Sequence, residues 1–209
     1  MKHVLTTAPS ELAVSVAEAK SHCRVDGTAE DAWFTNTVGA AVRMCEEMCD
    51  RAFVTQTWVL ALDAFPSTSG ECCDDPDRDG LTSAGEIVLP RAKVRSVDSI
   101  EYYDAAGDLQ TLSASVYQLD DLAEPGRVKP APGQAWPATE AGRYNAVRIT
   151  YQCGYGAAAA VDPRAKQAVL FLVNHWYENR GAVLVGSISK EIEQTLAAIL
   201  AQLWPGKMW

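Results

Sequence analysis

The spacing of apolar residues changes twice along the chain. Near the N-terminus they recur every three or four positions, which is typical of amphipathic helices. Ser15 followed by Glu18 is a capping-box pattern that predicts a helix over residues 16–23, and Gly27 suits the turn that follows. Thr28 with Asp31 predicts the start of a second helix that ends near Cys49. The expected buried face of this helix comprises Phe34, Val38, Ala41, Met44 or Cys45, and Met48.

From Thr55 onward the period becomes two, which is typical of strands. Gln56, Trp58, Leu60 and Leu62 alternate with Thr57, Val59 and Ala61. Further short strands are predicted at 86–89, 99–103, 109–112, 116–119 and 146–152. Six short strands joined by turns favour an antiparallel meander folded into a small sandwich or barrel.

Helical spacing returns after residue 160. Asp162 as N-cap and Pro163 at the first helical position predict a helix that ends near Arg180. A last helix is expected to begin at Ser187 or Ser189 and to end before Pro205. The predicted fold class is therefore α+β: a small bundle of about four helices, with an antiparallel β insertion between the second and third helices. Residues 1–53 and 160–209 would form the helical part, and residues 54–159 the β-rich insertion.

Composition and charge exclude several classes of protein. The 209 residues are 48% apolar and 22% charged, as in ordinary globular proteins. No apolar run approaches the length of a membrane span, and polar residues interrupt the N-terminal segment, so we expect neither a membrane protein nor a secreted one. The net charge of −9 and the lack of a basic tract argue against binding to phosphate backbones.

One acidic loop matches a calcium-binding pattern. Asp75, Asp77 and Asp79, with Gly80 and then Glu86, follow the spacing of an EF-hand loop, in which alternate acids converge on one ion. Against this interpretation, no helix is predicted to enter the loop and Glu86 begins a predicted strand. No cofactor is expected to be required, and Ca²⁺ is the one ligand that the sequence suggests.

The remaining catalytic signals are weak. Gly154–Ala159 resembles a dinucleotide fingerprint, but the next helix begins too late and no strand completes the unit. His175 and Glu178 are three positions apart on a helix and would serve a small hydrolase only with further partners. The cysteines include Cys45 and Cys49 on one helix face, which we expect to be buried, and Cys72 and Cys73 in a polar loop. We expect no enzyme activity.

The C-terminal segment is aromatic and begins where a helix ends. Large aromatic side chains on such a segment favour docking onto a partner protein, although the segment could equally fold back on its own domain. The candidate anchor residues are Leu203, Trp204, Pro205, Met208 and Trp209.

Several short motifs resemble those of the head–tail connector (adaptor) proteins of long-tailed phages and gene transfer agents. They occur in family order over nearly the whole chain: Ser15–Lys20 with Arg24–Asp26, Arg51–Trp58, Leu89–Arg91 with Val94–Ile100, Pro125–Arg127, Gly154–Gly156 and His175–Arg180. The acidic stretch 67–85 looks longer than its counterpart in that family, so the resemblance says nothing about calcium.

The resemblance implies a structural virion protein without catalytic residues. Such adaptors form a ring, of twelve subunits in the family, beneath the portal protein. The ring extends the DNA channel and docks a stopper or other neck protein, and DNA passes without specific binding. The C-terminal segment would reach the portal. We place candidate subunit contacts on the last two helices at Trp176, Tyr177, Arg180, Ile192 and Leu196. The chain would be made in the host cytoplasm and reside in the virion neck, and the alternative function is a calcium-binding β-rich interaction module.

Overall fold

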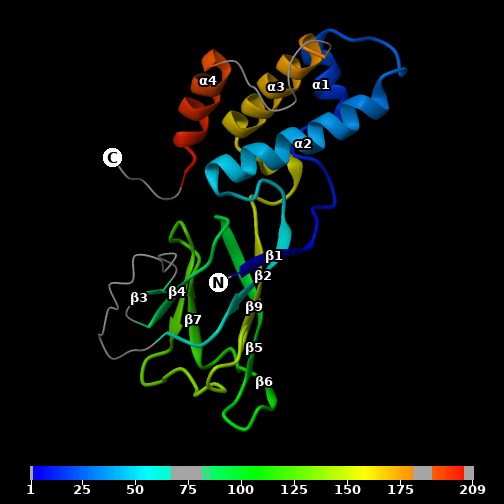
Figure 1. Cartoon of the computed structure of the whole chain (residues 1–209). Coiled ribbons are helices and arrows are strands. Elements are labelled where there is room, and N and C mark those ends of the chain that lie inside the picture. Colours follow the sequence, from blue (N-terminus) through cyan, green and yellow to red (C-terminus); the bar gives the residue numbers. More distant parts are fainter. Residues whose placement is uncertain (1, 67–81, 84, 181–189, 205–209) are drawn as a thin grey trace. The chain divides into compact units, whose positions relative to one another are not determined.

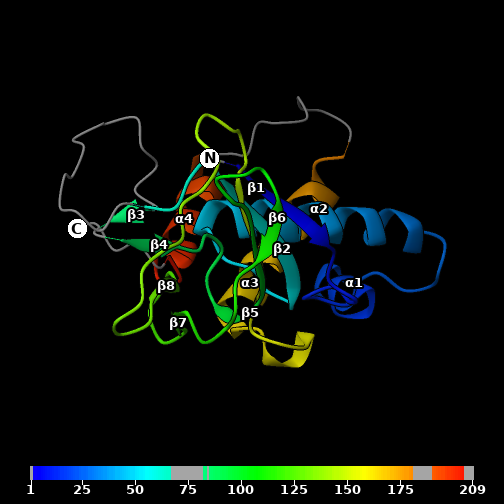
Figure 2. The same ribbon diagram turned by 90° about the horizontal axis from the view of Figure 1, so that it is seen from below.

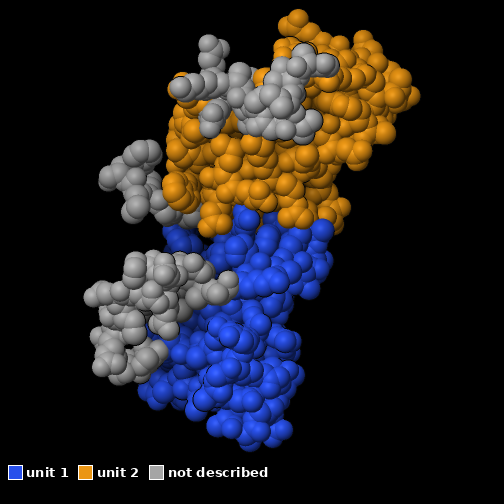
Figure 3. Space-filling model, viewed as in Figure 1, with its two compact units in different colours: residues 1–8, 56–154 blue, residues 9–55, 155–209 orange. Residues whose placement is uncertain are grey.

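A computed structural model describes residues 2–66, 82–83, 85–180 and 190–204. The chain divides into two compact units, coloured separately in Figure 3. Unit 1 comprises residues 1–8 and 56–154, and unit 2 comprises residues 9–55 and 155–209. The predicted division placed residues 1–8 with the helices, whereas here they belong with the strands.

Unit 2 contains the four helices that the sequence predicts. They are α1 (Val16–Cys23), α2 (Asp31–Cys49), α3 (Pro163–Glu178) and α4 (Lys190–Ala201), with a short 3-10 turn, η1 (Ala158–Ala160), before α3. Helices α2 and α3 pack against each other, and α1 and α4 lie on opposite sides of α3 (Figure 1).

Local signals set most of the helix starts. The Ser15 hydroxyl accepts from the Glu18 amide while the Glu18 carboxylate accepts from the Ser15 amide, which completes the predicted capping box of α1. The Asp162 carboxylate accepts from the Arg164 amide at the start of α3. The start of α2 differs from the prediction: its N-cap is Glu30, which makes no side-chain capping bond, and Thr28 contributes only its carbonyl.

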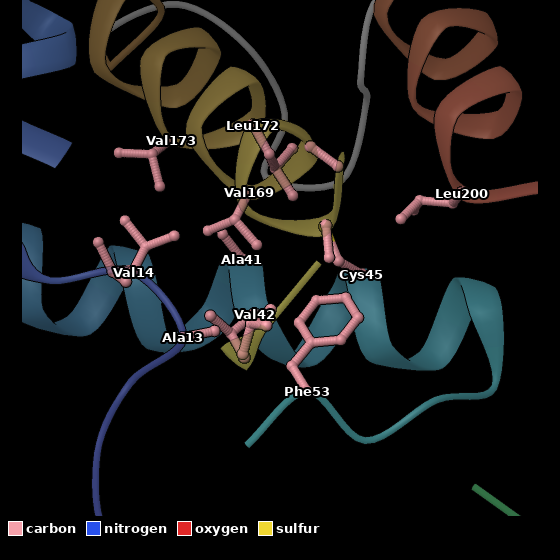
Figure 4. Close-up of a cluster of buried hydrophobic side chains, with 14 of the residues drawn as sticks. Ala13, Val14, Ala41, Val42, Cys45, Phe53, Val169, Leu172, Val173 and Leu200 are labelled. Atoms are coloured by element: carbon pink, nitrogen blue, oxygen red, sulfur yellow. The ribbon is translucent and has the colours of Figure 1, made fainter. Parts of the chain in front are cut away.

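The core of unit 2 forms where α2 and α3 face each other. Figure 4 shows Ala41 and Cys45 of α2 close to Val169 and Leu172 of α3, with Phe53 beside them. The predicted face of α2 is correct from Phe34 to Cys45, but Met48 is exposed and Cys49 takes the buried position. The buried stripe therefore advances by one residue along the last turn of α2.

Unit 1 contains two antiparallel sheets. The five-stranded sheet has the order β1 (Lys2–Thr7), β2 (Gln56–Leu62), β9 (Val147–Cys153), β5 (Val94–Tyr103), β6 (Leu109–Thr111). The four-stranded sheet has the order β3 (Thr82–Ser83), β4 (Glu86–Val88), β8 (Arg127–Pro130), β7 (Tyr117–Asp120), and lies to one side of the first in both views (Figures 1 and 2). Antiparallel sheets are thus confirmed, but the predicted meander is wrong, because β2 and β5 both pair with the distant β9.

The interior of unit 1 is built on the alternation predicted for β2. Leu60 pairs with Ile149 of β9, which in turn pairs with Ile100 of β5, and all three side chains are fully buried. Strand β5 begins five residues before its predicted start. Its pairing with β9 shifts register twice, so its side chains do not follow a regular alternation.

Candidate interaction surfaces

The C-terminal segment begins at a fixed point of unit 2. Leu203 is 2% exposed and lies in the core, whereas the next residue, Trp204, is 48% exposed. The Nε of Arg51, just beyond the end of α2, donates a hydrogen bond to the Leu203 carbonyl. Pro205, Met208 and Trp209 lie outside the described residues.

The Arg51 side chain also donates a second hydrogen bond, to Tyr155. It is 6% exposed, and its Nη1 donates to the hydroxyl of Tyr155 at 3.3 Å. A buried guanidinium needs several acceptors, and here the acceptors include the last turn after α4. Of the predicted anchor residues, Leu203 therefore belongs to the core, whereas Trp204 is half exposed.

Helix α4 packs into unit 2 with the residues predicted to face inward. Leu196 and Leu200 are buried in the core shared with α2 and α3. Leu196 thus packs within its own unit, and its predicted role in a subunit contact stays a prediction. Ile192 lies in α4, and its side chain lies outside the described residues.

Tyr177 and Arg180 form a cluster with the start of α2. The Arg180 Cζ lies 4.1 Å from the ring centroids of both Trp33 and Tyr177. Arg180 Nη1 donates to one carboxylate oxygen of Glu30 at 2.5 Å, and the Tyr177 hydroxyl donates to the other at 3.1 Å. The hydrogen bond from Arg180 lowers the pKa of Glu30. These two predicted contact residues thus bind within their own unit, while Trp176 packs partly buried against the core.

Glu86 is the only predicted calcium ligand within the described residues. Its carboxylate forms ion pairs with Arg127 at 3.4 Å and Lys129 at 4.0 Å, and Arg127 also pairs with Asp120 at 2.8 Å. This carboxylate therefore lies between two cations of the neighbouring strand β8. Asp75, Asp77 and Asp79 lie outside the described residues, so calcium binding stays an untested prediction.

The weak catalytic motifs also have structural roles. His175 Nδ1 lies 3.2 Å from the Asn179 amide nitrogen, and Glu178 accepts from Asn174 at 3.2 Å, so the two are engaged with different asparagines. Gly154 has a φ of 125° in the link between β9 and α3. Within the described ranges, no group of three or more His, Cys, Asp or Glu could hold a metal ion.

Cys45 and Cys49 occupy one buried helix face, as predicted. The Cys49 thiol donates to the Cys45 carbonyl at 3.0 Å. Burial raises the pKa of each thiol to about 12, which keeps both protonated at neutral pH. They therefore act as small core residues. Cys72 and Cys73 lie outside the described residues.

Two strongly exposed apolar side chains were not predicted as sites. Leu122, in the turn between β7 and β8, is 89% exposed, and Tyr144, just before β9, is 82% exposed. Single residues in turns carry no periodic pattern, so the sequence offered no signal beyond an aromatic residue among polar neighbours.

None of the helices that the structure describes combines the length and apolar character needed to cross a bilayer.

The fold of the entire chain is similar to that of chains from gene transfer agent particles. A chain from the "Neck of empty GTA particle computed with C6 symmetry" has a TM-score of 0.75 and 24% identity, covering 100% of this chain and 98% of that one. A chain from the "Virion of native gene transfer agent (GTA) particle" has a TM-score of 0.73 and 24% identity over the same shares.

A third chain, from the "Neck of native GTA particle computed with C12 symmetry", has a TM-score of 0.69 and 22% identity, again over 100% and 98%. No family model and no curated protein sequence matches the chain. These comparisons show that the chain has the fold of chains from gene transfer agent particles. Because the similarity covers 100% of the chain, it includes both units.

Proposed function

We propose that this chain is a structural head–tail connector, or adaptor, in the neck of a phage-like particle. The observation that carries the proposal is the likeness in fold over 100% of the chain to chains of gene transfer agent necks. The motif resemblance in the sequence leads to the same family independently. In this role the chain sits at the head–tail interface and performs no reaction.

The proposed mechanism is assembly into a ring beneath the portal. Two of the similar chains come from necks reconstructed with sixfold or twelvefold symmetry, which supports a ring of twelve copies. In a closed ring each subunit presents two different complementary faces. The exposed Trp204 and the segment after it would reach the portal, and the ring would dock the next neck protein on its other side.

The charge of the chain suits a channel through which DNA slides. With a net charge of −9, the ring would repel phosphates, so DNA would pass without being held. The thiols of Cys45 and Cys49 are protonated and buried, which agrees with a structural role.

Electron microscopy of particles that contain this chain tests the proposal. We expect the neck density to accommodate both units, repeated around the particle axis with twelve copies. Particles from a strain that lacks the chain provide the control and should have unjoined heads and tails. The proposal would be overturned if the neck showed no density for this fold, whether the chain was found elsewhere in the particle or was absent from it.

A further inference from the structure

One end of the five-stranded sheet of unit 1 lies away from the points where the chain passes into unit 2. The chain crosses after Ala8, before Gln56 and after Gly154. At the end of the sheet where it crosses, Thr7 pairs with Thr57, and Gln56 pairs with Cys153. At the opposite end Leu62 pairs with Val147, which pairs with Tyr102. We call this opposite end, with the β5–β6 hairpin and residues 140–146, the distal end; it is the lower end of unit 1 in Figure 1.

Tyr144 projects from the distal end between two anchored neighbours. On one side, the Arg143 guanidinium lies 3.4 Å from the ring centroid of Tyr103 and pairs with Glu140 at 2.7 Å. On the other side, the Asn145 amide donates to the Asp63 carboxylate at 2.7 Å. The backbone at Tyr144 is thus held while its ring is 82% exposed.

A second apolar side chain lies in the adjoining hairpin. Leu109, 53% exposed, pairs in register with Tyr103, the residue over which Arg143 stacks. The hairpin loop is ordered by Asp104, whose Oδ1 accepts from the amides of Ala106 at 2.9 Å and Asp108 at 3.0 Å. Exposed apolar groups on ordered loops lose little entropy on binding, which favours their use as interface anchors.

The charges around these two residues are mainly negative. Asp104 and Asp108 lie in the hairpin loop and Glu140 near Tyr144, where it pairs with Arg143. Asp63, directly after β2, binds the amide of Asn145. A surface of this kind complements an apolar pocket with a basic rim. DNA, whose phosphates are negatively charged, would be repelled by this surface.

We propose that the distal end of unit 1 is the docking surface for a basic protein of the neck or tail, with Tyr144 as its central anchor and Leu109 beside it. This inference rests on the proposed function, because it identifies the surface through which the ring would hold its next component. An aromatic ring buried in a partner pocket, with a rim of opposite charge, supplies both affinity and orientation.

The test measures binding of the purified full-length chain to each of the other purified neck and tail proteins of the same particle, to a second copy of itself and to double-stranded DNA, by biolayer interferometry. We compare wild type with Tyr144→Ala, Asp108→Lys and the control Leu122→Ala. Leu122 is more exposed than Tyr144 but lies outside the distal end, in the turn between β7 and β8 of the four-stranded sheet.

We expect one basic partner to bind. Tyr144→Ala should raise its Kd about 30-fold or more, as for a central interface residue, and Asp108→Lys should also weaken binding. Leu122→Ala should stay within about twofold of wild type. Equal Kd values for wild type and Tyr144→Ala, loss of binding in Leu122→Ala alone, or binding only to another copy or to DNA would each overturn the inference. The proposed function fails instead if the chain is missing from the neck density.

Discussion

Arg51 and Leu203 are separated by 152 positions in sequence and joined by a hydrogen bond from the Arg51 Nε to the Leu203 carbonyl. Arg51 follows α2, and Leu203 follows α4. The bond therefore connects the ends of two helices, and it holds the residue directly before the half-exposed Trp204.

Replacing Arg51 with Leu should destabilise the chain. The buried Leu203 carbonyl would lose its donor, which typically costs about 1–3 kcal/mol in the free energy of unfolding. Denaturant unfolding measures the change, and Arg43→Leu serves as the control because Arg43 is an exposed arginine of α2, the helix that Arg51 follows. If both variants unfolded at the same denaturant concentration, the Arg51–Leu203 hydrogen bond would not contribute to the free energy of unfolding.

The capping box of α1 should give the chain a pH-dependent stability. Hydrogen bonds from the Ser15 amide and hydroxyl, each 2.7 Å to the Glu18 carboxylate, lower the pKa of Glu18 below its usual 4.5. Because the folded pKa is the lower one, this stabilisation is complete above the unfolded pKa. It is lost as the pH falls through the folded pKa.

The Glu18→Gln variant should therefore be less stable than wild type at pH 7, by about 0.3–1 kcal/mol as for an acid near a helix N-terminus. The difference should shrink as the pH falls below 4.5. Unfolding midpoints from pH 7 to pH 3 measure this effect, with Glu47→Gln, exposed on α2, as the control. A gap that stayed constant down to pH 3 would contradict the assignment.

Two glycine substitutions should change stability in opposite directions. A Cβ at Gly126 would lie 2.7 Å from both Cβ and Cγ2 of Val94, so Gly126→Ala forces core atoms apart and should cost about 1–3 kcal/mol. A Cβ at Gly39 in α2 meets nothing within 4 Å, so Gly39→Ala should stabilise the helix by about 0.5–1 kcal/mol. Thermal unfolding of both variants measures the signs, and shifts in the same direction would refute the argument.

Removing the aromatic rings of the C-terminal segment should weaken binding to the portal and leave the fold intact. The double variant Trp204→Ala, Trp209→Ala tests this, because Trp204 is half exposed and is not needed for the core. Co-sedimentation with purified portal protein is the measurement, and unfolding midpoints should match wild type. The matched control is Phe171→Ala, which removes an exposed aromatic ring on α3. Unchanged co-sedimentation of the double variant would refute the anchoring role.

The helices and the strand β2 were predictable because their signals are local. Ser15 with Glu18, and Asp162 with Pro163, form helix starts from residues within one turn of each other. Strand β2 is buried on one face only, so its alternation is directly visible in the sequence.

Strand β1 could not be predicted from such a pattern. It lies at the edge of its sheet, and five of its six residues are exposed, so no face of it is marked by apolar residues. Strand β8 contributes Val128 as its single fully buried residue, which is too little for a periodic signal. The exposure of Tyr144 could not be predicted from the sequence either. It depends on contacts of its neighbours Arg143 and Asn145 with Tyr103 and Asp63, which lie in other parts of the chain.

The sequence by itself determined four helices, the antiparallel character of the β region and the aromatic C-terminal segment, because period and capping act over a few residues. Only the tertiary structure decided that β9 lies between β2 and β5, that Met48 lies outside the core, and that Arg51 binds the Leu203 carbonyl. These features depend on contacts between residues far apart in the chain. Pairing and packing are settled by the free energy of the whole unit, which no local pattern contains.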